Sequence, residues 1–490
     1  MDVVLRADAG VNIGGGHVMR CLTLAQALER QGAQVAFACR KGTGEVVSRL
    51  GERIWRELPQ GLAPEREAQW LADGWPEGCD LLVVDHYGLD ARFERACRDW
   101  ARRILVIDDL ADRPHDADWL LDQTPGRHAR AYAGLVNPEC RMLLGADHLL
   151  LRPAFARARH AARSRRLAGG RSGRLLVTLG LTDAHNVTAR ILEGIAASGV
   201  AAEVDVVLGG GAPHLEAVRG LAGKMPFPVT THVDVPHMER LMARADLAIG
   251  AGGTSSWERC CLGLPAITVT IADNQLGVAR VLEEADASLT AAPGGVAARL
   301  AELWGDDARL ARMGENAARL CDGLGAPRTA MILRPGRAAD GRPVRLRPAT
   351  ATDVRLVWTW QQDPGIRRHA RQPRPPAWEE HERWMTARLA DPGALFHLIL
   401  HDEEPAGLLR FDRLPDGTHE VSILVATASQ RLGLAAEAVR LGRFLMPEAR
   451  LLAWIKPENS ASLALFAKAG YRRLDDHCFI LEPTEVQEAE

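Results

Sequence analysis

Several features that mark particular classes of protein are missing from this sequence. The nine cysteines are scattered and form no CxxC pair, so no disulfide framework is indicated and a reducing cytoplasm is the expected compartment. No apolar stretch approaches the roughly 20 residues of a membrane span. The opening MDVVLRADAG has no basic start or long apolar core, so we expect no signal peptide. A net charge of −3 gives no electrostatic reason to expect nucleic acid or a membrane as a partner.

Length and patterning indicate several domains. The 490 residues are too many for one typical domain, and three is the expected number. Apolar residues make up 47% and charged residues 25%, as is ordinary for a globular protein. Alternating strand-like and helix-like segments predict two successive α/β domains, residues 1–151 and 152–333. A third domain with a different pattern follows at 343–483.

A glycine-rich turn near the start of the chain is the most informative local feature. Val3–Leu5 predicts a buried strand, Gly14–Gly16 form the turn, and Val18–Leu28 has the pattern of an amphipathic helix. These are the parts of a doubly wound α/β domain, in which ligands lie beyond the carboxyl ends of the strands. His17 therefore stands at the mouth of a cleft. The positive end of the helix there favours the neutral imidazole that a general base needs.

The same segments have simpler interpretations. A glycine turn can merely join strand to helix with His17 as a cap, and the dinucleotide fingerprint GxGxxG is missing here. Two further predicted strands, Asp80–Asp85 and Arg103–Asp109, end in acids where cleft residues gather, but such carboxylates also cap helices. Spacing alone leaves both interpretations open.

A second glycine turn, Gly252–Ser256, follows a predicted strand in the second domain. Glycines and hydroxyls in front of a helix can bind a diphosphate through backbone N–H and Oγ groups. Glu258, on the first helical turn, is placed to accept hydrogen bonds from ribose hydroxyls. The alternative is an N-cap at Ser255 with Glu258 completing a capping box, and both can hold together. The lysine of a Walker A loop is absent.

From Met1 to about Leu333 the chain resembles the UDP-sugar hydrolases of the pseudaminic acid pathway, which have the GT-B fold of MurG-type glycosyltransferases. The resemblance spans both domains in order and lies in RAD (6–8), IGGGHVMRCLTLA (13–25), VDHY (84–87), IDDLADRPHDAD (107–118), LLRPAF (150–155), LVTLG (176–180), GAGGTSSWERCCLGLP (250–265) and ADNQ (272–275). It implies cleavage of UDP-2,4-diacetamido-2,4,6-trideoxy-β-L-altropyranose to UDP and the free sugar.

The resemblance also implies roles for residues. His17 takes the position of the family's catalytic base, which activates the attacking water, and no metal is expected. The substrate-binding residues that it implies are Asp8, Gly15, Gly16, Thr182, Gly253, Thr254, Ser255, Glu258, Asn274 and Gln275. One departure is Leu181, where the family usually has a second glycine after LVTLG. A side chain there is large enough to crowd a nucleotide.

After a predicted linker at 334–342, the third domain resembles the GNAT acetyltransferases. The resemblance lies in the segments LRPATATD (346–353), QRLGLA (430–435) and ENSASLALFAKAGYRR (458–473). In this fold the amides of the second segment bind the pyrophosphate of acetyl-CoA at a helix N-terminus. The implied acetyl-CoA contacts are Val425, Gln430, Arg431, Gly433, Leu434, Ala435 and Asn459. WQQDPGIRR (360–368) and WEEHERWM (378–385) look like the subfamily that acetylates 4-amino nucleotide sugars.

The sequence does not fix which residues act as acid and base in this third domain. Many GNAT enzymes place a tyrosine seven residues after the asparagine of the last helix, and here that position is Phe466. The general acid is therefore elsewhere or unnecessary, with Glu420, Ser422 and His477 as unranked candidates. A GNAT-like domain that has lost its activity is the alternative.

The expected fold class is α/β, with two Rossmann-like domains in GT-B arrangement followed by an α+β GNAT domain. The expected substrates are a UDP-sugar and acetyl-CoA: acetylation completes a 2,4-diacetamido sugar on UDP, and hydrolysis releases it. One alternative keeps the fold but makes the first two domains a GT-B glycosyltransferase. Another is a nucleotide-sugar-binding protein without chemistry. The stereochemistry of the sugar is not fixed, since a 2,4-diamino sugar of legionaminic acid pathways would need similar loops.

Overall fold

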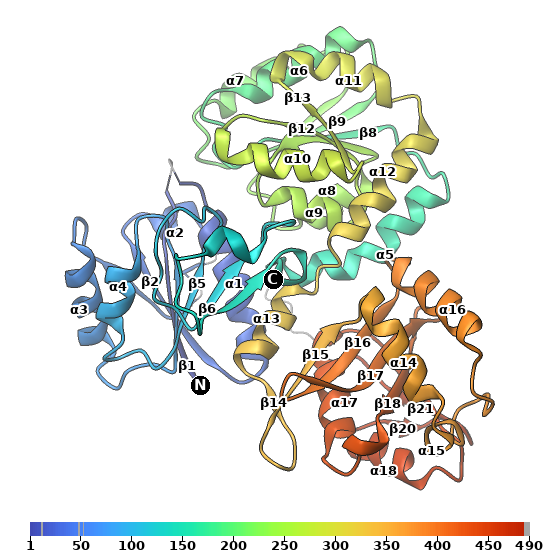
Figure 1. Ribbon diagram of the computed structural model, residues 1–490. Helices are drawn as coiled ribbons and strands as arrows, with labels where there is room; N and C mark the ends of the chain where they lie inside the picture. Colours follow the sequence, from blue (N-terminus) through green and yellow to red (C-terminus); the bar gives the residue numbers. More distant parts are fainter. Residues whose placement is uncertain (11–12, 48–49, 52, 485–490) are drawn as a thin grey trace. The chain divides into compact units, whose positions relative to one another are not determined.

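The computed structural model describes residues 1–10, 13–47, 50–51 and 53–484, and the chain divides into two compact units, Met1–Ala326 and Pro327–Glu490. The first unit contains two sheets and the second is built around a third (Figure 1). Across the described residues we find no helix whose length and apolar character would suffice to cross a membrane.

The first sheet is parallel, with strand order β3-β2-β1-β4-β5-β6-β7. Its strands are β1 (Asp2–Ala7), β2 (Gln34–Arg40), β3 (Trp55–Leu58), β4 (Leu81–Asp85), β5 (Ile104–Ile107), β6 (Trp119–Asp122) and β7 (Arg141–Leu144). Its helices are α1 (Gly16–Arg30), α2 (Thr43–Val46), α3 (Pro64–Gly74) and α4 (Ala91–Cys97), with α1 and the α3–α4 pair on opposite faces (Figure 1). The strand order reverses between β1 and β4, and ligands bind at such switch points.

The second sheet is also parallel, with order β10-β9-β8-β11-β12-β13. Its strands are β8 (Arg174–Thr178), β9 (Glu203–Leu208), β10 (Val229–Val233), β11 (Leu247–Ala251), β12 (Ala266–Val269) and β13 (Ser288–Ala291). The helices from here to the unit boundary are α5 (Pro153–Leu167), α6 (Val187–Ser198), α7 (Leu215–Ala222), α8 (Met238–Arg244), α9 (Ser255–Cys261), α10 (Leu276–Glu284), α11 (Val296–Leu303), α12 (Asp307–Leu320) and α13 (Gly325–Leu333). Separate apolar cores fill the two faces, one with α6, α7 and α11, the other with α8, α9 and α10.

The third sheet is mixed, with order β14-β15-β16-β17-β18-β19-β21-β20. Its strands are β14 (Gly336–Arg337), β15 (Pro343–Pro348), β16 (Leu395–His401), β17 (Glu404–Arg413), β18 (His419–Val425), β19 (Leu451–Trp454), β20 (Arg472–Arg473) and β21 (Cys478–Leu481). Its helices are α14 (Val354–Gln361), α15 (Pro364–Arg367), α16 (Trp378–Ala390), α17 (Leu434–Leu445) and α18 (Ser460–Lys468). Helices α14 and α16 pack on one apolar core, and α17 and α18 on another. Strands β18 and β19 run parallel and pair at His419–Leu451 and Glu420–Leu452.

One segment expected to be a connection forms part of a sheet, and a second, basic segment is a helix with a buried anchor. The predicted linker at 334–342 contributes β14, which pairs with β15 in the sheet of the second unit. The basic, Gly-rich segment Arg157–Arg174, for which the sequence allows a linker or a surface helix, belongs to helix α5 as far as Leu167, and this helix is anchored in the interior. Its Arg159 is 7% exposed and donates to the carbonyls of Cys261, Ala318 and Cys321.

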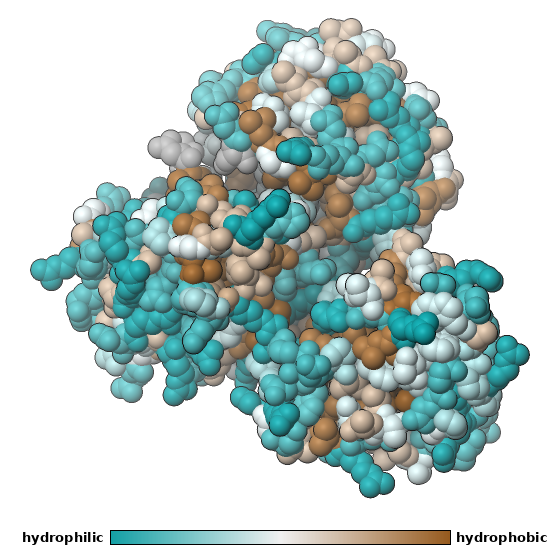
Figure 2. All heavy atoms as spheres, viewed as in Figure 1, coloured by the Kyte–Doolittle hydropathy of each residue, from teal (hydrophilic) through white to brown (hydrophobic). Residues whose placement is uncertain are grey.

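Apolar side chains are gathered between the sheets and their helices. The face of the molecule drawn in Figure 2 is mainly hydrophilic, with apolar residues in small groups. The sites of interest are therefore better sought at strand ends and in cavities than on a broad apolar surface.

Candidate functional site

The imidazole of His17 is held by a carboxylate from the neighbouring strand. His17 is the second residue of α1, and its Nδ1 lies 2.5 Å from Oδ1 of Asp85, the last residue of β4. An ionised carboxylate only accepts, so Nδ1 carries the proton and the neutral ring keeps a lone pair on Nε2. None of the described residues hydrogen-bonds that Nε2. The pair sits at the switch point between β1 and β4, and its tautomer is the one a general base needs.

Arg20, one helical turn further along α1, keeps Asp85 ionised. Its Nε and Nη2 donate to the two oxygens of Asp85 at 2.6 and 2.7 Å, and its Nη1 donates to Asp109 at 2.9 Å. Burial by itself would raise the pKa of Asp85, but the charges and hydrogen bonds of Arg20 and His17 hold that pKa well below its usual range. Arg20 Nη2 also lies 3.2 Å from Nδ1 of His17, which is not a hydrogen bond because Nδ1 already carries a proton.

These contacts decide between the two interpretations of the strand-end acids. Helix α4 is capped by Asp90, which accepts from the N–H of Arg92, so Asp85 is not the cap. Asp109 accepts from Arg20 instead of capping a helix. Both acids belong to the surroundings of His17.

Tyr87 forms the exposed edge of the same group. Its ring meets that of His17 edge to face, with centroids 4.6 Å apart, and the residue is 39% exposed. Burial of the hydroxyl and its hydrogen bond with Asp109 raise the pKa of Tyr87, so the hydroxyl stays protonated and can donate. The Tyr87 hydroxyl is thus a polar group at the solvent side of His17.

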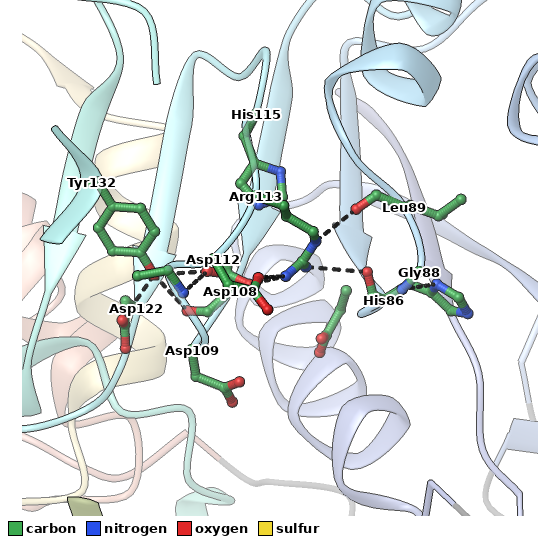
Figure 3. Close-up of polar contacts among 12 residues, drawn as sticks. His86, Gly88, Leu89, Asp108, Asp109, Asp112, Arg113, His115, Asp122 and Tyr132 are labelled. Carbon is green, nitrogen blue, oxygen red and sulfur yellow. Dashed lines mark hydrogen bonds and ion pairs between the residues drawn. The ribbon is translucent and has the colours of Figure 1, made fainter. Parts of the chain in front are cut away.

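A second polar network fixes the loop that carries Tyr87 (Figure 3). Arg113 donates to the carbonyls of His86 and Leu89 and pairs with Asp108 at 2.8 Å. The hydroxyl of Tyr132 lies 2.9 Å from an oxygen of Asp108 and 2.8 Å from an oxygen of Asp122, and it can donate its single proton to either carboxylate. The ends of β4, β5 and β6 are therefore tied together behind the loop at His86–Leu89.

Asp8 lies close to this group but is fully engaged by protein atoms. It is 4% exposed, and its oxygens accept from Arg6, from the backbone N–H of Arg40 and from His86 at 3.3 Å. The Arg6, His86 and Arg40 contacts lower the pKa of Asp8 against the opposing effect of burial. Its predicted part in substrate binding stays a prediction, and the geometry suits it to positioning His86.

The glycine turn of the second sheet approaches the start of α1. A Cβ built on Gly16 would lie 3.8 Å from Oγ1 of Thr254, an ordinary van der Waals distance. Thr254 is the N-cap of α9, and its side chain makes no capping hydrogen bond. Ser255 is the first residue of the helix, so the capping box expected with Ser255 as N-cap is not formed. The hydroxyl of Thr254 thus faces the glycines that precede His17.

Glu258 lies on the first turn of α9, and its surroundings disfavour the ionised carboxylate. Burial raises its pKa, while the charges of Arg152 and Arg259 partly offset that effect. No hydrogen bond to its carboxylate is found among the described residues. Beneath the turn, the buried guanidinium of Arg259 donates to the carbonyl of Ala251 and to Oγ of Ser256, which fixes the turn from below.

Other predicted contacts gather around the same turn. A Cβ on Gly252 would lie 3.0 Å from the carbonyl oxygen of Gln275, so the 3-10 turn Asp273–Gln275 packs directly against the glycines. The side chain of Asn274 lies outside the described residues. Thr182 follows β8 at the neighbouring strand end. Leu181 beside it is 42% exposed, and its carbonyl accepts from the N–H of Gly209 at 2.8 Å.

In the second unit, the predicted acetyl-CoA loop precedes a long helix. Gly433 is the N-cap of α17 with φ of 75°, a left-handed conformation that favours glycine. Leu434 and Ala435 form the first turn of that helix, and Gln430 donates to the carbonyl of Val425 at 3.3 Å. Leu432 accepts from the N–H of Ala339, so the hairpin of β14 supports the loop. The first amides of a helix have no partner within the helix, so the amides at this helix start suit a pyrophosphate.

The strand pair beside this loop opens into a wedge. The strand pairing of β18 with β19 ends after Glu420–Leu452, although β18 continues to Val425. Asn459 caps α18 across the wedge, where its side chain accepts from the N–H of Ser462. An opening between parallel strands can receive the extended, amide-bearing arm of acetyl-CoA.

A cavity of about 1070 Å³ adjoins the wedge. Of the candidate acids, Glu420 and Ser422 line it, as does Phe466, while His477 stacks on Trp454 with centroids 5.3 Å apart. Glu420 is paired with Arg371, whose Nη2 lies 3.0 Å from both carboxylate oxygens. The cavity wall also carries side chains from α15, α16 and the segment 369–376.

Comparison with known proteins agrees with this division. Residues 344–472 match the model of the acetyltransferase (GNAT) domain. The UDP-2,4-diacetamido-2,4,6-trideoxy-beta-L-altropyranose hydrolase of Campylobacter jejuni is 24% identical over 250 residues, which cover 51% of this chain and 84% of that protein. The spore coat polysaccharide biosynthesis protein SpsG of Bacillus subtilis is 28% identical over 297 residues, 59% of this chain and 83% of that protein.

A third relative and a solved structure bear on the architecture. The protein MJ1062 of Methanocaldococcus jannaschii is 22% identical over 396 residues, 79% of this chain and 78% of its own length, more than the first unit alone supplies. The crystal structure of MurG from Acinetobacter baumannii matches with a TM-score of 0.50 at 16% identity, over 68% of this chain and 99% of that one. The first unit therefore has the GT-B fold and is distantly related to a UDP-sugar hydrolase. The second is a GNAT acetyltransferase domain, which implies use of acetyl-CoA.

Sequence reasoning named His17 and left Asp85 and Asp109 open as cleft residues, but it did not assign Arg20 or Tyr87 to the site. Arg20 and Tyr87 lay within quoted segments, and Arg20 is one helical turn from His17, a spacing that places both on one face of α1. The buried His381 and the arginines that line the cavity of the second unit were not anticipated either. His381 and Arg367 come from segments that indicated only a subfamily, and the other arginines lie outside those segments.

Proposed function

We propose that this protein is a bifunctional nucleotide-sugar enzyme. Its second unit acetylates the amine of a UDP-4-amino sugar. Its first unit then hydrolyses the resulting UDP-2,4-diacetamido-2,4,6-trideoxy sugar to UDP and free sugar, as in the formation of pseudaminic and related acids. The observation that carries the hydrolytic half is the ionised Asp85 at 2.5 Å from Nδ1 of His17, next to the Thr254 turn.

The hydrolytic step follows from the tautomer of His17. Nε2 takes a proton from water while the water oxygen bonds to the anomeric carbon and the bond from that carbon to the UDP oxygen breaks. The imidazolium that forms is stabilised by Asp85, whose own charge is retained by Arg20. The leaving diphosphate is received by the hydroxyls and amides of Gly253, Thr254 and Ser255, and the ribose by Glu258. Asn274 and Gln275 complete the substrate contacts.

The cavity of the second unit supports an anionic acceptor. Four arginines and two glutamates line it, which leaves an excess of positive charge: Arg367, Arg371, Arg374, Arg410, Glu380 and Glu420. A diphosphate-linked amino sugar carries the complementary charge, whereas a free amino sugar is cationic. The order acetylation before hydrolysis follows, since the acceptor still carries UDP when it binds.

Mass spectrometry of the products tests both halves. The protein is supplied with UDP-2-acetamido-4-amino-2,4,6-trideoxy sugars of different stereochemistry and acetyl-CoA, in water enriched in ¹⁸O. We expect an acetylated UDP-sugar, then UDP and a diacetamido sugar that carries one ¹⁸O at its anomeric position. Label in UDP would mean attack at phosphorus and would contradict the role of His17. Sugar transfer to an added alcohol in preference to water would favour a glycosyltransferase instead.

A further inference from the structure

A buried histidine borders the cavity of the second unit. His381 lies on the first turn of α16, is 2% exposed and belongs to the wall of the cavity of about 1070 Å³. Neither the loop at Gln430–Ala435 nor the wedge between β18 and β19 involves it. Its ring lies 5.9 Å from that of Trp384 on the same wall.

The tautomer of His381 is fixed by the backbone. Its Nε2 lies 3.1 Å from the carbonyl oxygen of Val354, the first residue of α14. A carbonyl oxygen can only accept, so Nε2 carries the proton and Nδ1 of the neutral ring holds a lone pair. Within the described part of the chain no group hydrogen-bonds Nδ1. Burial lowers the pKa of His381, against a smaller opposing effect of the Val354 hydrogen bond, so the ring is neutral at pH 7.

The charges around the cavity act in the same direction. Glu380 of α16, Arg410 of β17, Glu420 of β18 and the arginines at 367, 371 and 374 face it, together with His369. Their excess positive charge disfavours a second proton on His381 until a substrate brings negative charge. A neutral imidazole with a free lone pair is then ready to receive a proton.

The other candidate groups are less able to do so. Glu420 has both oxygens 3.0 Å from Arg371, so its carboxylate is already engaged by a guanidinium. Phe466 has no ionisable group, and a serine hydroxyl such as that of Ser422 is a poor base at neutral pH. His477 is stacked on Trp454 rather than among the cavity-wall residues.

We propose that His381 is the general base of acetyl transfer, with Nδ1 receiving a proton from the acceptor amine in this cavity. The inference rests on the proposed function in so far as this unit acetylates an amine. The ammonium gives one proton to Nδ1, and the freed lone pair forms a bond to the thioester carbonyl carbon while the carbon–sulfur bond breaks. The second proton lost from nitrogen goes to the departing thiolate, so the products are the amide, the thiol and imidazolium.

The test compares His381→Gln with the wild-type chain. Glutamine can keep a donor toward the Val354 carbonyl but cannot take the proton. Thiol release from acetyl-CoA is followed from pH 6 to 10 with UDP-4-amino sugars and a panel of unrelated primary amines. We expect kcat of His381→Gln to fall about 100-fold at pH 7. We also expect its rate to keep rising with pH toward the pKa of the amine, while the wild type levels off near neutrality.

Further measurements separate this proposal from its premise. His401→Gln, which alters an imidazole that is paired with Asp340 at 3.0 Å in the same unit but does not line the cavity, is expected to keep the wild-type profile. Nitrogen NMR of the wild-type imidazoles should show His381 as the Nε2–H tautomer, whether or not the variant folds. A wild-type rate and profile in His381→Gln, or an Nδ1–H tautomer, would overturn the assignment. Transfer only to other amines would refute the proposal that the acceptor is a UDP-sugar. The role of His381 would then be tested by comparing His381→Gln with the wild type on those amines. No transfer to any amine would overturn both.

Discussion

Nδ1 of His17 and Oδ1 of Asp85 are 2.5 Å apart, although 68 residues separate them in the chain. Parallel pairing of β1 with β4 brings the end of β4 beside the turn that leads into α1, and a histidine and an acid on adjacent strand ends then meet. The contact fixes which ring nitrogen is basic. The proposed hydrolysis depends on that choice of nitrogen.

Asp85→Asn is expected to lower kcat for UDP release by about 10²–10⁴-fold, because the amide no longer selects the Nδ1–H tautomer or stabilises imidazolium. UDP should bind with nearly unchanged affinity, since the Thr254 turn is untouched. Steady-state kinetics and calorimetric binding of UDP measure the two effects.

Glu94→Gln is a matched control for that change. Glu94 pairs with Nδ1 of His115 at 2.7 Å in the same sheet domain; both are buried, and no hydrogen bond of the described residues joins them to His17, Asp85 or Arg20. Loss of this pair is expected to lower the melting temperature while kcat of the folded enzyme stays the same. Equal losses of kcat in both variants would mean that Asp85 acts only through stability.

Glu258→Gln is expected to weaken UDP binding about 10- to 100-fold, the loss of a hydrogen bond to a charged group. Because the pKa of Glu258 is raised, its carboxylate protonates at a higher pH than an exposed glutamate does. The advantage of wild type over variant should therefore be full at neutral pH and shrink as pH falls through that raised pKa. Calorimetric titrations with UDP across the acid range measure the ratio of the two dissociation constants, variant over wild type, at each pH.

The same raised pKa predicts a gain in stability for this variant. A carboxyl whose folded pKa is raised begins to destabilise the folded state as pH rises above its unfolded pKa, and does so in full above its folded pKa. Glu258→Gln should thus melt at the same temperature as wild type or higher at pH 7. A clear loss of stability would indicate that Glu258 holds the fold rather than the ribose.

Gly433→Ala is expected to raise KM for acetyl-CoA, because a φ of 75° strains any side chain by about 1–2 kcal/mol and the loop amides would shift. Gly341→Ala is the matched control, with φ of 82° and open space around its Cβ, in the hairpin that supports the loop. Both variants should lose similar stability, measured by thermal unfolding. A normal KM for acetyl-CoA in Gly433→Ala would remove this turn from the acetyl-CoA site.

Central strands were predictable from sequence, and edge strands were not. Segments such as LLVVD of β4 are apolar because both faces are covered by helices. The unanticipated strands β3, β7, β10 and β13 lie at the edges of the two parallel sheets. Strand β10, for example, reads VTTHV and is fully buried at no position, so it lacks the apolar run that marks the central strands.

Site prediction had a similar limit. The first glycine turn and His17 stand next to each other in sequence, so local spacing reveals them. The contacts of Arg20 with Asp109, or of His381 with Val354, join residues 89 and 27 positions apart. Which nitrogen a histidine leaves free is set by such distant partners, and no local pattern encodes it.

The most direct test of the central claim is the rate of UDP release by His17→Ala, measured beside its affinity for UDP. We expect release from the diacetamido UDP-sugar to fall by at least about 10²-fold, the contribution of a general base, while the Kd for UDP stays within about threefold of wild type. A variant that binds UDP normally and releases it at the wild-type rate would contradict the assignment of His17 as the base.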